Sequence, residues 1–156
     1  MDRPEFAGRA SACAEQLYRV SWCILHNNTD CEDAVQEALF LAWKKLHTLR
    51  HPEYFETWLT RILINECRRM LRERISHTSV ALDEALTAAA PETNDPDLQE
   101  ALRRIDAKYS LPLILRHVSG YSTEEICRIL KLPKTTVKWR MGEARRRLAK
   151  LLNADL

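Results

Sequence analysis

Glycine is scarce in this chain, with three residues among 156. Stretches in which apolar and polar residues alternate, as they do in half-buried strands, are scarce as well. A sheet protein needs both such stretches and glycine-rich turns between them. We therefore predict an all-α protein.

Metal-binding patterns are also missing. No two of the five cysteines have the Cys-x-x-Cys spacing. His47 and His51 are four residues apart, but Pro52 follows and would disrupt the helix that could align them. We expect no metal ion and no cofactor. The cysteines lie in apolar helical patterns and are expected to be reduced core residues: Cys13, Cys23, Cys31, Cys67 and Cys127.

No apolar run approaches the length of a membrane span, and the acidic, polar N-terminus lacks a signal-peptide pattern. We expect a cytoplasmic protein without membrane insertion. The net charge of +2 is nearly neutral, yet residues 80–100 contain six acidic and no basic residues. This composition is typical of a flexible acidic linker. It predicts two small helical domains, residues 5–76 and 97–153, joined by a linker over 77–96.

A helix-turn-helix is indicated in the second domain. Ser122 and Glu125 have the spacing of a capping box, so a helix is expected to begin there. A turn is predicted at Lys131-Leu132-Pro133, because Pro133 cannot continue a helix but suits the start of a new one. The second helix would bury residues at helical spacing: Val137, Met141, Ala144, Leu148 and Leu151.

Basic residues dominate this second helix, with eight of them and one acidic residue between Lys131 and Lys150. A basic run can be no more than a solvated face, but this one follows a capping box and a turn, which favours nucleic acid. The first turns are expected to meet base edges and the later arginines to meet phosphates. The candidate DNA-binding residues are Lys134, Thr135, Thr136, Lys138, Trp139, Arg140 and Arg145, with Arg146, Arg147 and Lys150 as further phosphate contacts.

The first domain is predicted to hold three helices. The first would bury Ala10, Cys13, Leu17, Val20 and Ile24. We expect the second to begin at a Thr29 cap with Glu32 and to bury Val35, Ala38, Leu39, Ala42, Trp43 and Leu46. The third is expected over residues 54–74, with Phe55, Leu59, Ile62 and Met70 inward, and Trp58 is also expected in the core.

Two polar faces of this domain are candidate binding surfaces. The start of the second helix exposes an acidic cluster suited to a basic protein surface, although acidic residues also favour helix starts in general. The third helix has a basic face that could hold a nucleic-acid backbone, and Tyr54 could stack on an unpaired base. The acidic cluster is Glu32, Asp33, Gln36 and Glu37, and the basic face is Arg61, Asn65, Arg68, Arg69, Arg72 and Arg74.

Three motifs carry a resemblance to a known family. They are Asp33-Ala-Val-Gln-Glu-Ala-Leu-Phe-Leu-Ala-Trp43, Trp58-Leu-Thr-Arg-Ile-Leu-Ile-Asn65, and Gly120-Tyr-Ser-Thr-Glu-Glu-Ile126 with Thr136-Val-Lys-Trp-Arg140. In this order and spacing they resemble the extracytoplasmic-function (ECF) sigma factors of the sigma-70 family. The resemblance covers nearly the whole chain and implies a non-enzymatic initiation subunit of bacterial RNA polymerase.

The resemblance also implies partners and residue roles. Asp33, Gln36 and Glu37 would bind the clamp helices of the largest core polymerase subunit, and the C-terminal domain would rest on the flap of the second largest. The C-terminal helix would read double-stranded DNA at the minus-thirty-five element, and an anti-sigma factor is usual for the family. The locally melted minus-ten element would be held by Arg50, Tyr54, Arg61, Asn65, Arg68, Arg69 and Arg72.

The sequence departs from the family pattern at three positions. Lys131 stands where a turn glycine is common and would be strained if its backbone is left-handed. Trp139 stands where a small serine is common. Glu143 would repel phosphates, or else accept a hydrogen bond from a cytosine amino group.

Two other functional classes remain open from the residues alone. One is a stand-alone helix-turn-helix regulator that dimerises through its N-terminal helices. The other is a hydrolase in which Asp33 and Glu37 act as general acid and base, but no third partner or phosphate loop supports it.

Overall fold

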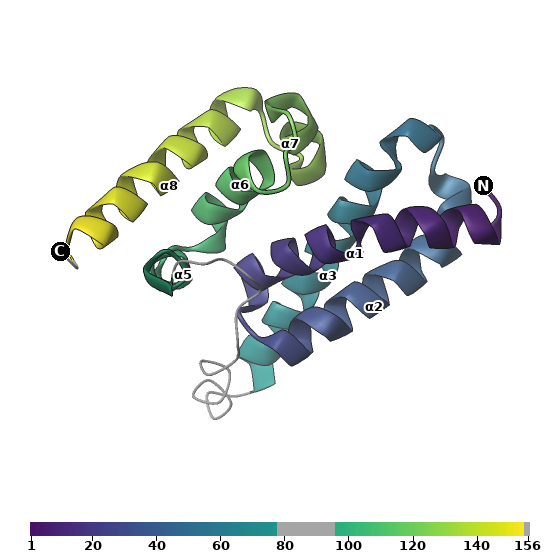
Figure 1. Cartoon of the computed structure of the whole chain (residues 1–156), viewed down its shortest axis with the longest axis horizontal. Helices are drawn as coiled ribbons and strands as arrows, with labels where there is room; N and C mark the ends of the chain where they lie inside the picture. Colours follow the sequence, from purple (N-terminus) through teal and green to yellow (C-terminus); the bar gives the residue numbers. More distant parts are fainter. Residues whose placement is uncertain (78–95, 155–156) are drawn as a thin grey trace. The chain divides into compact units, whose positions relative to one another are not determined.

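Helices make up the chain wherever the structure describes it. This computed structural model describes residues 1–77 and 96–154, and these ranges contain no strand. The helices belong to two compact units, Met1–Ala89 and Ala90–Leu156. Figure 1 shows their course along the chain. The predicted all-α fold is confirmed, whereas the predicted linker lies, apart from its end residues His77 and Pro96, outside the described residues.

Three helices pack against one another in the first unit. They are α1 (Arg3–Leu25), α2 (Asn28–Lys44) and α3 (Phe55–His77), and two short 3-10 turns, η1 (Leu46–Thr48) and η2 (Pro52–Tyr54), connect α2 to α3 (Figure 1). Asp2 caps α1 by accepting a 2.9 Å hydrogen bond from the Glu5 amide. All five residues predicted to be buried on α1 are buried: Ala10, Cys13, Leu17, Val20 and Ile24.

The start of α2 differs from the prediction. His26 ends α1 in the left-handed conformation, with φ of 52°, and Asn27 directly caps α2 by accepting a 2.9 Å hydrogen bond from the Asp30 amide. The predicted Thr29 cap is therefore wrong, because the connection between the two helices is shorter than the sequence suggested. Thr29 lies inside the first turn of α2.

The buried face of α2 is narrower than predicted: Ala38 and Ala42 are buried, but the larger side chains expected beside them are not. Its fully buried residues are small, which lets α1 and α3 approach closely. Trp43, predicted to be buried, is 42% exposed and lies at the flank, where its ring packs edge-on against Phe6 at 5.2 Å. Val35, Leu39 and Leu46 are half-buried. The buried residues of α2 are Cys31, Ala34, Ala38 and Ala42.

Helix α3 begins one residue later and ends three residues later than predicted. Phe55 and Leu59 are fully buried as expected, but Ile62 and Met70 are only half-buried, and so is Trp58. The inward face is rotated slightly, because α3 fills the space between α1 and α2 rather than covering one of them. Its other buried residues are Thr60, Leu63, Ile64, Glu66 and Cys67.

The second unit contains the predicted helix-turn-helix. Its helices are α5 (Pro96–Arg104), α6 (Ala107–His117), α7 (Thr123–Leu130) and α8 (Lys134–Ala154), and α8 packs on the other three (Figure 1). The Ser122–Glu125 capping box is present in both directions, at 3.1 and 3.0 Å. On α8, Val137, Met141 and Ala144 are buried, while Leu148 and Leu151 are half-buried.

Lys131 ends α7 in the left-handed conformation, with φ of 54° and its amide donating to the Cys127 carbonyl. The Leu132 amide donates to the same carbonyl at 3.1 Å. Pro133 then lies before α8, and its carbonyl accepts from the Val137 amide at 3.1 Å. The predicted turn is confirmed, and it sets the start of α8 at Lys134.

Candidate nucleic-acid and polymerase interfaces

The first turns of α8 carry the candidate DNA-binding side chains on their outer surface. At 100° per residue, Thr135 and Trp139 lie opposite the buried Val137, and both are exposed. Trp139 is 61% exposed. Of the other candidates on α8, Lys134, Lys138 and Arg145 are exposed, and Thr136 and Arg140 are half-buried.

Two of these basic side chains also bind other residues of the unit. Lys134 reaches Glu124 of α7 at 3.1 Å. A backbone hydrogen bond and then Lys134 hold the pKa of Glu124 below its usual value. A guanidinium nitrogen of Arg145 lies 3.2 Å from Nε2 of His117 on α6. Both contacts are exposed, so the side chains can exchange these partners for phosphates.

Glu143 does not face solvent as an unpaired carboxylate. It accepts hydrogen bonds from Arg146 at 2.5 and 3.1 Å and from Arg147 at 3.0 Å, and its side chain is 16% exposed. These two arginines, Arg146 first, lower the pKa of Glu143 to about 2. The alternatives that Glu143 repels phosphate or reads a cytosine are not supported by this geometry. Arg146 and Arg147, expected at phosphates, share their charge with it.

A continuous polar stripe runs along α3. Arg61, Asn65, Arg68 and Arg72 follow one another at spacings of four, three and four residues, so their side chains share one face. Arg61 is half-buried, and the other three are exposed. Trp58 extends the stripe towards the start of the helix, where the 46% exposed Tyr54 lies at the end of η2. The structure thus brings five of the seven predicted minus-ten residues onto one surface.

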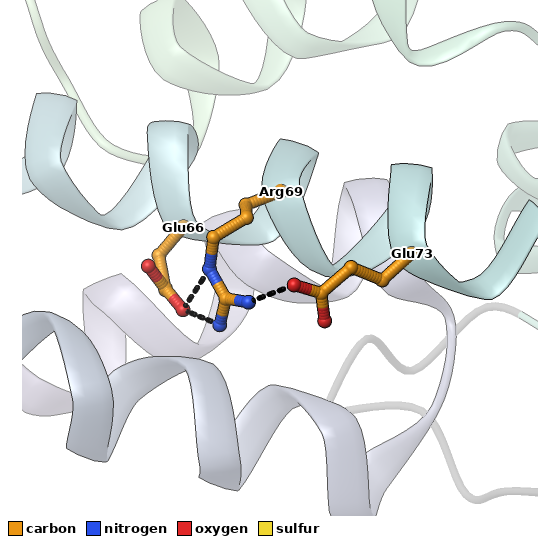
Figure 2. A network of polar contacts seen from close by, with 3 residues as sticks. All are labelled: Glu66, Arg69 and Glu73. Atoms are coloured by element: carbon orange, nitrogen blue, oxygen red, sulfur yellow. Dashed lines mark hydrogen bonds and ion pairs between the residues drawn. The ribbon is translucent and has the colours of Figure 1, made fainter. Parts of the chain in front are cut away.

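Arg69 does not belong to that stripe, because its guanidinium forms ion pairs with two glutamates on α3. Figure 2 shows its guanidinium between Glu66 and Glu73, with dashed contacts to both carboxylates. Its Nε donates to Glu66 at 2.9 Å and its Nη1 to Glu73 at 2.5 Å. These hydrogen bonds, first the one that Arg69 donates to Glu66, raise the pKa of Arg69. Since the Glu66 side chain is only 6% exposed, Arg69 has a structural role as the partner of a buried carboxylate.

The segment between α2 and α3 is attached to α1 by an arginine that the sequence did not single out. Arg9 donates a 2.8 Å hydrogen bond to the Pro52 carbonyl, and its guanidinium lies over the Phe55 ring, 4.7 Å from the centroid. In the same segment, Arg50 is exposed and His51 packs edge-on against Tyr54 at 5.9 Å. Arg9 therefore positions the entry to α3, next to the aromatic end of the stripe.

The acidic cluster of α2 is exposed and continues into an apolar residue. Asp33, Gln36 and Glu37 are all exposed, and Phe40, one further turn along the same face, is 56% exposed. The Lys44 ammonium lies over the Phe40 ring at 5.2 Å. Sequence reasoning missed Phe40, although its spacing of seven residues from Asp33 and three from Glu37 was a sufficient signal. Exposed aromatic residues flanked by charges are typical of protein interfaces.

Comparison with known families identifies both units. The Sigma-70 region 2 family model matches residues 10–75, and the Sigma-70, region 4 model matches residues 96–148. The ECF RNA polymerase sigma factor SigM of Mycobacterium tuberculosis is 30% identical over 140 residues, covering 88% of this chain and 71% of SigM. The chain is an ECF sigma factor. It therefore belongs to the proteins that direct promoter-specific initiation by bacterial RNA polymerase.

Two solved structures resemble this sigma factor over 99% of its length. One is the sigma factor RpoE in complex with the anti-sigma factor NepR from Bartonella quintana, with 25% identity, a TM-score of 0.80 and 100% of that chain covered. The other is CnrH in complex with the cytosolic domain of CnrY, also with 25% identity, a TM-score of 0.75 and 92% of that chain covered. Both support the two-domain fold.

The cysteines of the sigma factor are free thiols, and four of them are buried. Burial raises the pKa of Cys23 to about 12 and also raises that of Cys67, which keeps both thiols protonated. Across residues 1–77 and 96–154, no group of three or more potential ligands is placed to hold a metal ion. Within the same ranges, no helix combines the length and the apolar character needed to cross a bilayer.

Proposed function

We propose that this sigma factor divides its work among three surfaces, each with a different partner. The face of α2 around Asp33, Gln36, Glu37 and Phe40 binds core RNA polymerase. The stripe on α3 holds melted minus-ten DNA, and the outer face of α8 reads the minus-thirty-five duplex. The observation that carries this division is the polar stripe on α3, which leads from the aromatic rings of Tyr54 and Trp58 to the exposed cations Arg68 and Arg72.

The α3 stripe suits a single strand better than a duplex. Capturing an unpaired base costs a few kcal/mol of lost stacking, so aromatic and cationic groups are both needed to offset it. Tyr54 and Trp58 supply ring faces or edges at one end, and Arg61, Arg68 and Arg72 can follow the phosphates. Arg50 lies exposed in the segment before the stripe, where it can meet the same strand. We assign no DNA contact to Arg69.

The α2 face suits a basic helical surface such as the polymerase clamp. Its two carboxylates and one amide lie in the turns before Phe40, which offers an apolar side chain for burial. Interfaces of this kind obtain most of their affinity from the central aromatic residue, and the surrounding charges set the orientation. We propose Phe40 as the principal polymerase anchor. The second unit would rest on the flap while α8 is in the major groove.

An anti-sigma factor is also proposed as a partner. RpoE is seen in complex with the anti-sigma factor NepR, and CnrH in complex with the cytosolic domain of CnrY. Next to the polymerase face, an apolar groove of about 560 Å³ lies between α1 and α2 and is lined in part by Phe6, Leu39 and Trp43. A helix bound there would obstruct the α2 face. Because polymerase and promoter are its partners, we place the protein in the cytoplasm, acting without catalysis of its own.

Run-off transcription tests this proposal. Purified bacterial core polymerase, this protein and the DNA upstream of its own gene are expected to give a defined transcript that needs both proteins. If no transcript forms, the same mixture is tested for comigration of this protein with core polymerase. Binding to core without initiation would mean that the DNA does not carry the right promoter. Failure to bind core would contradict the proposal and favour a stand-alone regulator.

Variants separate the surfaces. Lys138→Ala or Arg140→Ala should weaken upstream-element recognition while core binding in a pull-down stays normal. Asp33→Ala and Phe40→Ala should weaken binding to core polymerase and leave upstream-element recognition intact. The loss of core affinity should be larger for Phe40→Ala, about tenfold or more. Normal core affinity in both Asp33→Ala and Phe40→Ala would refute the assignment of this face.

A further inference from the structure

Trp139 is the most exposed large apolar side chain among the described residues, at 61%. It lies on the outer face of α8, one turn beyond Thr135 and opposite the buried Val137. A single exposed apolar ring is common on protein surfaces. This one, however, lies among the exposed candidate DNA-binding residues Lys134, Thr135 and Lys138 of α8, which points to DNA as its partner. The family resemblance does not explain it, because a small serine is common at this position.

The indole is supported by the body of the unit. Tyr109 of α6 packs against it at a ring centroid distance of 6.0 Å and an interplanar angle of 60°. Tyr109 is itself held by the Arg147 guanidinium, 4.0 Å from its centroid, and by the Lys108 ammonium at 5.1 Å. Tyr109 thus restrains one edge of the indole, and the two cations lie beside Tyr109. The rest of the ring stays open to solvent.

Gly142 leaves the surface next to the indole open. It lies one turn after Trp139 in the interior of α8, where glycine is less favourable than alanine. Packing does not require it, since an added Cβ would meet no atom within 4 Å. The surface made of Trp139 and Gly142 is thus an apolar ring beside bare backbone, and a partner can approach it closely.

We propose that Trp139 determines promoter specificity by contacting the 5-methyl group of a thymine in the major groove of the minus-thirty-five element. This inference rests on the proposed function of α8. The thymine methyl is the apolar group that a base pair exposes in the major groove, and apolar side chains recognise it by contact. Lys134 and Lys138 in the same turns, and Lys108 beside Tyr109, hold the flanking phosphates. Tyr109 is the positioning residue, and Gly142 lets the groove edge approach.

The chemical test removes single methyl groups. Promoter DNA found by run-off transcription is prepared with each minus-thirty-five thymine replaced by deoxyuridine, and the affinity of the full chain bound to core polymerase is measured. We expect about a fourfold loss at one or two positions, the value of burying one methyl group. Trp139→Ala should bind the unmodified element about tenfold more weakly and should no longer distinguish thymine from deoxyuridine. Trp139→Phe should retain part of the discrimination.

Two further variants test the supporting residues. Gly142→Leu should raise the thermal stability of the unit, because leucine favours helices, yet weaken DNA binding. Tyr109→Ala should reduce the thymine preference without changing the affinity for core. Equal deoxyuridine losses in the wild type and in Trp139→Ala, or a loss of core binding in Trp139→Ala, would overturn the proposal; the second result would assign the indole to a protein partner. Transcription from unmodified DNA tests the proposed function separately, because it depends on no single methyl group.

Discussion

At the scale of single residues, Glu143 controls how much positive charge α8 offers to DNA. It accepts hydrogen bonds from both Arg146 and Arg147, so these two arginines are partly neutralised. Such a pair keeps non-specific attraction to phosphates low while the arginines stay in place. We therefore expect the carboxylate to favour specific over non-specific binding. The sequence alone left open whether it repels phosphates or accepts a hydrogen bond from a cytosine amino group.

Glu143→Gln should therefore tighten DNA binding in a salt-dependent way. With the carboxylate neutral, both arginines can turn to phosphates, and each new contact steepens the dependence of log affinity on log salt concentration by about 0.9. We expect a slope steeper by about 1 to 2, measured with the full chain and core on promoter and on unrelated DNA. Unrelated DNA should gain at least as much affinity as promoter. An unchanged slope on both DNAs would contradict the neutralising role.

Arg69 and its neighbour Arg68 should behave differently although both are exposed arginines on α3. Arg69→Ala removes the guanidinium that pairs with the buried Glu66, and leaving a buried polar group unsatisfied costs about 1–3 kcal/mol. Thermal unfolding should therefore show a loss of stability, with little direct effect on minus-ten DNA. Arg68→Ala should lower the melting temperature less than Arg69→Ala does, because the contacts of an exposed arginine contribute little to stability, and it should weaken promoter opening. The assignments would be wrong if the two variants exchanged these effects.

At the scale of elements, the turn between α7 and α8 stores strain at Lys131. A residue with a Cβ is disfavoured in the left-handed conformation by roughly 1–2 kcal/mol, and glycine is not. Lys131→Gly should raise the stability of the second unit by about 1 kcal/mol in denaturant unfolding. Lys131→Ala keeps the Cβ and so serves as the control, with an expected change of only a few tenths. Equal stabilisation by alanine would mean that lysine charge, not backbone strain, is responsible.

The segment between α2 and α3 should depend on Arg9, which lies in a different element. Arg9→Ala removes both the hydrogen bond to Pro52 and the contact with Phe55, and with them the fixed path into α3. We expect normal core binding but two- to tenfold slower promoter opening, the equivalent of one lost hydrogen bond, measured by permanganate reactivity of the melted thymines. Arg9→Lys should recover part of the rate. Full activity of Arg9→Ala would exclude a positioning role.

Local signals in the sequence predicted the elements well, and tertiary packing accounts for the errors. The capping box and the turn at Pro133 involve neighbouring residues, so the helix-turn-helix could be read directly. The Thr29 cap and the burial of Trp43 were wrong because the close packing of α1 and α2, through small residues, decides both. The pairing of Glu143 with arginines three and four positions later was visible in the spacing but was not used.

At the scale of the whole molecule, the two surfaces that we propose to read DNA lie in separate units, so promoter recognition should depend on the distance between their targets. Linked weak sites act together only when the geometry lets both bind at once. One turn of the DNA helix is about 10 to 10.5 base pairs. Inserting five base pairs between the two elements therefore moves one of them to about the opposite side of the DNA helix. We expect run-off transcription to fall at least tenfold, although each element keeps its sequence and core binding is untouched.

The control for this experiment is a promoter of normal spacing with the upstream element scrambled, since it removes α8 recognition outright. If the insertion and the scrambled element reduce transcription alike, the second unit contributes only when correctly spaced. Undiminished transcription from the insertion would show that one unit suffices for recognition. Lys138→Ala provides a second control. Because this variant reads the upstream element poorly, its transcription should fall little further when the spacing is altered. The spacing penalty therefore measures how much of promoter recognition α8 supplies.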